Sequence, residues 1–204
     1  MLNLVIFGGP GSGKGTQSDR LIEKYGLHHI STGEVLRNHI ASGDELGKIA
    51  DGYISQGHLI PDELMIRVLE NLLDSHPEKV KNGVIFDGFP RTIEQAKALK
   101  EMLGRRGTRI HAVLGLEVPD EELSARMINR GKQTGRADDN EDTIKERLSV
   151  YHNQTAPLRE YYMDEGKYHA IDGQGTIEDV FTRIGDSLNR RLPEVMASHN
   201  TIKN

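Results

Sequence analysis

The feature that most constrains this chain is the nonapeptide GGPGSGKGT at residues 8–16. It follows an apolar run at residues 2–7 and precedes a helical pattern that carries Leu21 and Ile22. A glycine-rich loop between a strand and a helix binds phosphate, because its backbone N–H groups converge on an anion at the helix N-terminus. A plain flexible turn would not need a lysine among so many glycines. The pattern therefore predicts a phosphate loop at residues 8–16.

Two side chains of this loop suit a nucleoside triphosphate. Lys14 carries a positive charge that can reach the β- and γ-phosphates, and the Thr16 hydroxyl can serve the shell of a metal ion. The general pattern has Ser or Thr directly after the lysine, whereas here Gly15 intervenes. The residues expected to bind the triphosphate are Gly11, Ser12, Gly13, Lys14, Gly15 and Thr16.

The rest of the chain predicts an α/β fold. Short apolar runs at residues 2–7, 27–30, 84–87, 110–116 and 168–171 alternate with helical patterns. Five such runs predict a five-stranded parallel sheet with helices on both faces, a three-layer α/β/α arrangement. Ligands of such sheets bind at the carboxyl ends of the strands, where Gly8, Ser31 and Asp87 fall.

Several segments carry weaker signals. A helix that begins at Asp62 is expected to close at His76-Pro77, and a long helix over 143–165 is expected to bend near Pro157. Residues 130–142 are polar and charged, so we expect an exposed, mobile loop there. The polar residues after Pro193 predict a frayed tail over 193–204.

Composition excludes several classes of protein. With no cysteine, the chain has no disulfide framework and no thiolate zinc site. The net charge of −5 comes with scattered Lys and Arg, so we expect no nucleic-acid partner. No apolar run approaches the ~18 residues of a membrane span, and residues 1–7 fit a strand better than a signal peptide. We therefore expect a cytoplasmic monomer.

Four motifs resemble those of adenylate kinase. They lie at residues 8–16, 31–37, 86–92 with Gln95, and 131–139, and the resemblance extends from residue 2 to about 190. It implies one kinase domain over 1–192, with a core of 1–31, 62–126 and 139–192. A helical unit over 32–61 would bind the nucleoside monophosphate, and 127–138 would form a short lid. Longer-lid relatives often carry zinc, for which this chain lacks the cysteines.

The resemblance also implies an activity, the reversible transfer of the γ-phosphoryl group of Mg-ATP to AMP to give two ADP. A phosphate monoester has a second pKa of about 6 and is mostly ionised at neutral pH, so this acceptor needs no general base. What it needs is positioning and the neutralisation of spreading charge. Magnesium would come with ATP and be oriented through water by Thr16 and Asp87.

The resemblance assigns residues to three sets. The catalytic set is Lys14, Arg91, Arg126, Arg130, Arg136 and Arg147. The ATP set adds Arg130 and Gly175 to the phosphate loop. The AMP set is Thr32, Arg37, His58, Leu59, Ile60, Gly88, Phe89, Pro90, Arg91, Gln95, Arg136 and Arg147. Glu34 stands where many relatives have Asp.

Alternatives exist for both the residues and the function. Without the resemblance, Arg37 and Gln95 fit a solvated helix face, and Arg91 fits a salt bridge at a helix start. A UMP/CMP kinase would share the fold and motifs, but residues 89–92 with Gln95 look more like the adenylate branch. A nucleotide-dependent switch would also use a phosphate loop. A GTPase switch would be expected to carry an Asn-Lys-x-Asp motif, which is absent, and a switch would leave the arginines unexplained.

Overall fold

The computed structural model describes residues 1–75, 77–78 and 80–202 of the chain. Its centre is a five-stranded, wholly parallel sheet in the order β2-β3-β1-β4-β5. The strands are β1 (Leu4–Gly8), β2 (His28–Ser31), β3 (Val84–Asp87), β4 (Ala112–Glu117) and β5 (Tyr168–Asp172). The five-stranded parallel sheet is confirmed, and each strand overlaps the apolar run that predicted it.

Helices connect the strands and cover the sheet. They are α1 (Lys14–Tyr25), α2 (Thr32–Ser42), α3 (Glu45–Ile54), α4 (Asp62–Ser75), α5 (Ile93–Arg105), α6 (Asp120–Thr134), α7 (Glu141–Val150), α8 (Leu158–Asp164), α9 (Ile177–Arg191) and α10 (Pro193–Ile202), with one π-helical turn η1 (Tyr151–Thr155). His76, at the expected end of the helix that begins at Asp62, lies outside the described residues. Within the described ranges, no helix has the length and apolar character that crossing a membrane requires.

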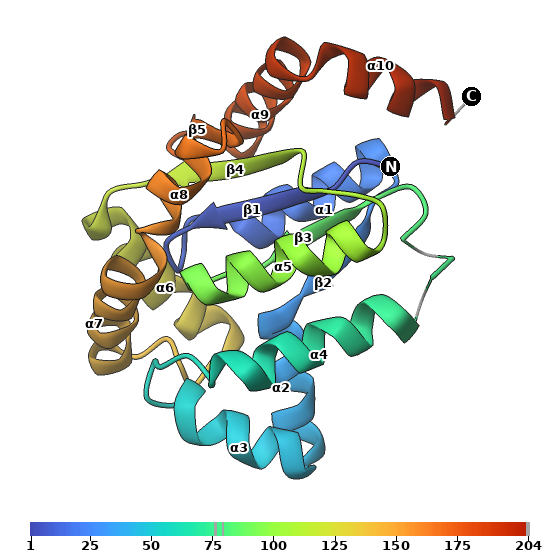
Figure 1. The fold of residues 1–204 in the computed structure, drawn as a ribbon. Helices are drawn as coiled ribbons and strands as arrows, with labels where there is room; N and C mark the ends of the chain where they lie inside the picture. Colours follow the sequence, from blue (N-terminus) through green and yellow to red (C-terminus); the bar gives the residue numbers. More distant parts are fainter. Residues whose placement is uncertain (76, 79, 203–204) are drawn as a thin grey trace.

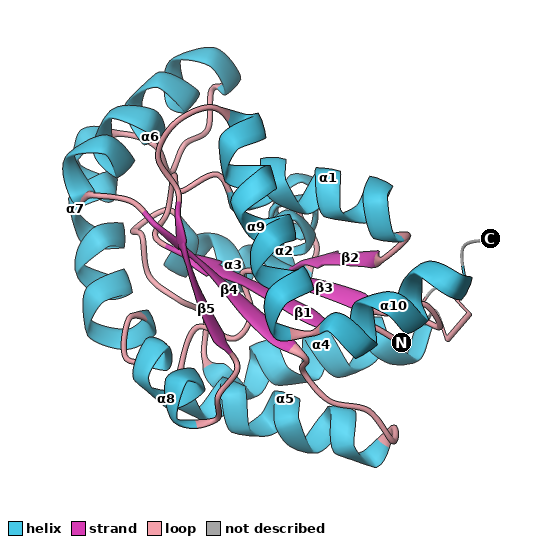
Figure 2. Cartoon of the chain, turned by 90° about the horizontal axis from the view of Figure 1, so that it is seen from above, coloured by secondary structure: helices cyan, strands magenta, loops and turns pink. Residues whose placement is uncertain are grey.

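The sheet is buried on both faces, which explains its continuous apolar strands. Along β1, Leu4 and Ile6 belong to one core cluster, whereas Val5 and Phe7 belong to the other. Side chains of α1, α9 and α10 build the first cluster, and those of α4, α5 and α8 build the second. Figure 2 shows the strands between these two layers. The predicted three-layer arrangement is therefore confirmed.

The connections position a site at the carboxyl edge of the sheet. Ile6 of β1 and Ser31 of β2 both pair with Asp87 of β3, so these three strands end side by side. From this edge α2 and α3 project away from the sheet on one flank, and α6 and α7 lie on the other (Figure 1). The loops that follow β1, β2 and β3 therefore share the space between two helical flanks.

The polar segment at 130–142 is mostly exposed, as its composition predicts, but only part of it is a loop. Helix α6 runs on to Thr134 and ends at Gly135, whose φ of 66° allows a left-handed cap. The turn that follows buries the carboxylates of Asp138 and Asp139. The segment has few apolar side chains to bury, and it is ordered by ion pairs instead. Composition alone does not reveal such pairs.

Two further expectations concern the C-terminal half. The predicted long helix is interrupted as expected near Pro157, where η1 separates α7 from α8. In place of the frayed tail predicted for 193–204, the described residues form α10 up to Ile202. The physical reason is apolar anchoring, because Met196 is only 2% exposed and packs, beside the partly buried Val195, in the core cluster that contains Leu2 and Leu188.

We predict that Met196→Ala lowers the free energy of unfolding by about 2 kcal/mol, because it removes a buried side chain and leaves a cavity. Urea denaturation followed by circular dichroism measures this change. Glu194→Ala, at an exposed position of the same helix, is the matched control and should alter stability by less than about 0.5 kcal/mol. Equal stability of the Met196 variant and the parent protein would show that α10 does not dock on the core.

Candidate active site

One cavity of about 540 Å³ opens at the carboxyl edge of the sheet. Most of the predicted site residues line it, namely Gly11, Gly13, Lys14, Gly15, Thr16, Thr32, Arg37, His58, Leu59, Ile60, Asp87, Gly88, Pro90, Arg91, Gln95, Arg130, Arg136 and Arg147. Ser12, Phe89, Arg126 and Gly175 are not among its lining residues. The structure thus brings both predicted nucleotide sets to one place, with four exceptions.

The phosphate loop presents the start of α1 to this cavity. Gly13 caps the helix with a φ of 94°, a conformation that favours glycine. Helix α1 has no side-chain cap and no acidic residue in its first turn. In contrast, the side chains of Ser31 and Thr92 cap α2 and α5. The first N–H groups of α1 therefore have no side-chain acceptor and suit an anionic ligand.

Lys14 is the first residue of α1 and is held inside the loop. Its Nζ donates to the carbonyls of Gly8 and Gly9, both at 2.9 Å. Burial lowers the pKa of Lys14 to about 8, an effect that Asp87 opposes and Arg91 reinforces. A bound polyphosphate would favour the charged ammonium, so this lysine is placed to gain its full charge together with an anion.

On the opposite wall of the cavity, Gly88 connects the segment after β3 with the side chains of Thr32 and Arg91. Thr32 Oγ1 and Arg91 Nε each donate to the Gly88 carbonyl at 2.8 Å. A side chain at Gly88 would collide with both partners, because a Cβ there would lie 2.8 Å from Thr32 Oγ1 and 3.0 Å from Arg91 Nη2. Burial lowers the pKa of Arg91 to about 10. The guanidinium is thus fixed in the cavity and held among other cations.

Gln95 is held in place by Asp62, a residue that sequence reasoning did not select. Gln95 Oε1 accepts from the Arg91 backbone N–H at 2.8 Å, and its Nε2 donates to Asp62 Oδ1 at 2.8 Å. Thr92 Oγ1 donates to the other carboxylate oxygen of Asp62 at 2.9 Å. Gln95 is only 2% exposed, so it is not the solvated helical glutamine of the alternative interpretation.

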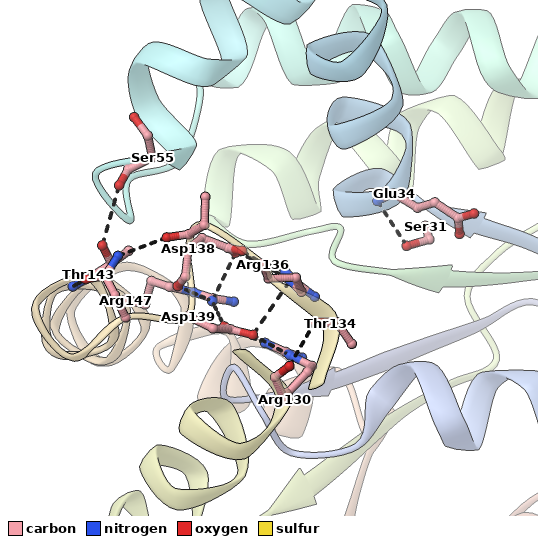
Figure 3. Close-up of polar contacts among 12 residues, drawn as sticks. Ser31, Glu34, Ser55, Arg130, Thr134, Arg136, Asp138, Asp139, Thr143 and Arg147 are labelled. Atoms are coloured by element: carbon pink, nitrogen blue, oxygen red, sulfur yellow. Dashed lines mark hydrogen bonds and ion pairs between the residues drawn. The ribbon is translucent and has the colours of Figure 1, made fainter. Parts of the chain in front are cut away.

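Side chains of α6, α7 and the turn between them form an ion-pair network around two carboxylates (Figure 3). Asp139, whose side chain is 0% exposed, accepts from Arg130 Nε at 2.6 Å and from Arg147 Nη1 at 2.6 Å. Asp138 accepts from Arg136 Nη2 at 2.9 Å and pairs with Arg147 at 3.0 Å. Two carboxylates thereby hold three guanidinium groups that would otherwise repel one another.

The electrostatics of this network follow from these contacts. Burial alone would raise the pKa of Asp138, but the hydrogen bond from Arg136 and the charge of Arg147 outweigh it and lower the pKa to about 2. The hydrogen bond to Asp139 raises the pKa of Arg130. These shifts favour the charged forms of Asp138 and Arg130 at neutral pH.

Helix α7 also touches the 32–61 unit across the cavity. Thr143 Oγ1 donates to the Ser55 carbonyl at 3.5 Å, and His58 Nε2 lies 3.2 Å from Glu146 Oε1. Between them Gly57, with a φ of 83°, passes so close to α7 that a Cβ would lie 3.0 Å from Arg147 Cγ. These contacts close one side of the cavity over Arg147.

The residues present suit a metal ion only when a nucleotide supplies most of its ligands. Among the described residues, no group of three acidic, His or Cys side chains could hold a metal by itself. Asp87 and Thr16 both line the cavity. Burial raises the pKa of Asp87, but the nearby His29 ring and the charge of Lys14 outweigh it and lower that pKa, so the carboxylate stays ionised. One carboxylate and one hydroxyl fit a hydrated cation that rests on phosphate oxygens.

Arg126 lies apart from the other predicted catalytic arginines. It forms an ion pair with Glu122, one turn earlier on α6, and its Nη2 donates to the Gly173 carbonyl at 3.1 Å. Its Nη1 lies 3.5 Å from the Ser12 carbonyl. The resemblance assigns Arg126 to the catalytic set, but its contacts hold it beside Ser12 of the phosphate loop and it does not line the cavity. Gly175 belongs to that same neighbourhood.

Sequence reasoning missed four residues that organise the site. Asp138 and Asp139 were noted only as part of a motif, and Asp62 only as the start of a helix. His29 lines the cavity, where its buried Nε2 lies 3.7 Å from Asp87 Oδ2 and makes no hydrogen bond. The one available signal was the pair of adjacent aspartates beside so many arginines, which favours ion pairing.

Comparison with known proteins identifies relatives along most of the chain. The family model described as adenylate kinase matches residues 6–167. An adenylate kinase of Bacteroides fragilis is 64% identical over 184 residues, which cover 90% of this chain and 96% of that protein. Adenylate kinases of Bacteroides thetaiotaomicron and Porphyromonas gingivalis are 60% and 50% identical over 190 residues, covering 93% of this chain and 100% and 97% of theirs.

We predict that Asp138 stabilises the fold at neutral pH and loses this effect in acid. Its pKa is about 2 in the folded chain against 3.8 as the ordinary value, so the folded state binds the proton less tightly. The stabilisation is complete above pH 3.8 and is lost as the pH falls toward 2. Asp138→Asn should therefore be less stable at pH 7 and show a flatter loss of stability between pH 4 and 2.

Urea denaturation across this pH range is the measurement. Asp164→Asn is the matched control, because Asp164 is exposed and makes no ion pair in the part of the chain that the structure describes. A pH dependence of the Asp138 variant that is parallel to that of the parent protein would contradict the assignment.

Proposed function

The chain belongs to the adenylate kinase family, and on that premise we propose how the cavity of about 540 Å³ holds ATP and AMP while a phosphoryl group passes between them. The observation that carries the proposal is the arrangement of the cavity. A helix N-terminus with Lys14 forms one wall, Arg91 with Thr32 forms the opposite wall, and three carboxylate-held arginines lie on the lid side. This arrangement suits two phosphate chains that meet end to end.

The donor triphosphate would lie on the phosphate loop. The first N–H groups of α1 would bind its β-phosphate, and Lys14 would move from the Gly8 and Gly9 carbonyls to the β- and γ-oxygens. The donor base would extend past Ser12 toward Arg126 and Gly175. Arg126 offers a flat guanidinium there, and a planar guanidinium stacks well on an aromatic ring.

The acceptor would lie on the opposite wall. Arg91 and Arg37 would bind its phosphate, and its adenine would lie against the pocket of His58, Leu59 and Ile60. Gln95 keeps one free amide hydrogen and one free lone pair after its two contacts, which suffices to pair with an adenine edge. The similarity to adenylate kinases favours AMP over UMP or CMP as the acceptor.

The transfer itself needs no protein base. An ionised oxygen of the AMP phosphate attacks the γ-phosphorus, the bond from that phosphorus to the β–γ bridging oxygen breaks, and both products are ADP. Negative charge spreads over the transferring group during this step. Arg130, Arg136 and Arg147 are already oriented by their carboxylates and would stabilise that charge without reorganisation.

Water must be kept from the transferring group, since water would otherwise accept the phosphoryl group in place of AMP. We propose that residues 32–61 and the lid at 127–138 are the two units that cover the nucleotides. The contacts of Ser55 and His58 with α7 support this, because they bring the first unit across the cavity toward the lid side.

Magnesium would bind with ATP, with Thr16 and Asp87 nearest to it and water in between. When bound, the ion neutralises phosphate charge and orients the transferring group. The chain itself keeps the Asp87 carboxylate ionised and holds the Thr16 hydroxyl in the phosphate loop. We propose that the enzyme acts as a cytoplasmic monomer in adenine nucleotide homeostasis, which its family and its net charge of −5 support.

We predict that Arg91→Ala raises the KM for AMP by about 10- to 100-fold, the effect of losing a charge-assisted hydrogen bond to phosphate. The KM for ATP should change by less than about threefold, because Arg91 lies on the acceptor wall. Steady-state kinetics with each nucleotide varied in turn measure both values. Arg67→Ala, at an exposed position on α4, is the control for loss of an arginine. A larger effect on ATP than on AMP would reverse the assignment of the two walls.

A further inference from the structure

Glu122 on α6 links two segments that flank the outer side of the phosphate loop. One carboxylate oxygen forms the ion pair with Arg126. The other, Oε2, accepts from Gln174 Nε2 at 2.8 Å. Gln174 belongs to the donor loop, residues 173–176, which connects β5 to α9. A single carboxylate thus ties an arginine of α6 to a loop some fifty residues away in sequence.

The ion pair leaves Arg126 little freedom. Its guanidinium has acceptors from three directions, which are the Glu122 carboxylate, the Gly173 carbonyl and, at 3.5 Å, the Ser12 carbonyl of the phosphate loop. The hydrogen bonds of a guanidinium lie in its plane, so three in-plane partners fix the orientation of that plane. The Arg126 side chain is 30% exposed, so part of it is accessible to a flat ligand.

The far end of the donor loop is also tied to α1, the helix that follows the phosphate loop. Gln17 on α1 donates from Nε2 to the Ile177 carbonyl at 3.0 Å. Gly175 has a φ of 98°, so the loop makes its turn without a side chain. Ile177 is 54% exposed and offers an apolar surface at the end of the loop. Arg126 and the donor loop therefore stand as two walls next to the phosphate loop.

From this geometry we propose that Glu122, through its contacts with Arg126 and Gln174, is a positioning residue for the base of the donor nucleotide. The inference rests on the proposed placement of ATP on the phosphate loop. Glu122 fixes the plane of Arg126 and sets its separation from the donor loop, so that the base enters a slot that is already formed. It does not touch the phosphates, and the AMP side does not depend on it.

The test is a double-mutant cycle of Glu122→Ala and Arg126→Ala in the full-length enzyme, with the KM for ATP and for AMP measured for each variant. Glu122→Ala should raise the KM for ATP about three- to tenfold, the size of one partly exposed charge-assisted contact, and leave the KM for AMP within about twofold. In the Arg126→Ala background the same substitution should have almost no further effect, because its route to the base is gone.

Glu121→Ala is the matched control, since Glu121 is the neighbouring residue of α6 and is exposed. It removes the same charge and should leave both KM values unchanged. If Glu122→Ala acts equally in both backgrounds, or raises both KM values together, Glu122 has a structural role and the inference is wrong. If Arg126→Ala itself leaves the KM for ATP unchanged, the placement of the donor base in the proposed function is wrong as well.

Discussion

The structure depends on the neutralisation of crowded positive charge. Six cationic side chains line one cavity, namely Lys14, Arg37, Arg91, Arg130, Arg136 and Arg147. Such charges repel one another where water is scarce, and the pKa values of Lys14 and Arg91 are lowered chiefly by burial and further by the neighbouring cations. Asp138 and Asp139 offset part of it by pairing with three of the arginines. The remaining positive charge is what two phosphate chains require.

Much of the fold was predictable because its determinants are local. The phosphate loop requires glycines such as Gly13 at a left-handed cap, and the interruption near Pro157 follows from a residue that does not continue a helix. Both signals arise from backbone geometry within a few residues. The parallel sheet followed from apolar runs that are buried on both faces, a consequence of composition rather than of distant contacts.

The remainder of the site depends on contacts between distant segments. Asp139 is buried because Arg130 and Arg147 come to it from two helices, and no local pattern distinguishes it from a solvated aspartate. The resemblance assigned Arg126 to the catalytic set, yet its contacts with Gly173 and Ser12 hold it outside the cavity lining. Helix α10 is ordered through Met196, with Val195 packed against the same core cluster, in a mostly polar stretch.

The central claim is that both nucleotides occupy the cavity together and that the phosphoryl group passes directly between them. Initial-rate kinetics with ATP and AMP varied against each other test it most directly. Direct transfer predicts double-reciprocal lines that intersect, since no product can leave before both substrates have bound. Parallel lines, together with release of ADP from ATP in the absence of AMP, would show a phosphorylated enzyme intermediate and contradict the account.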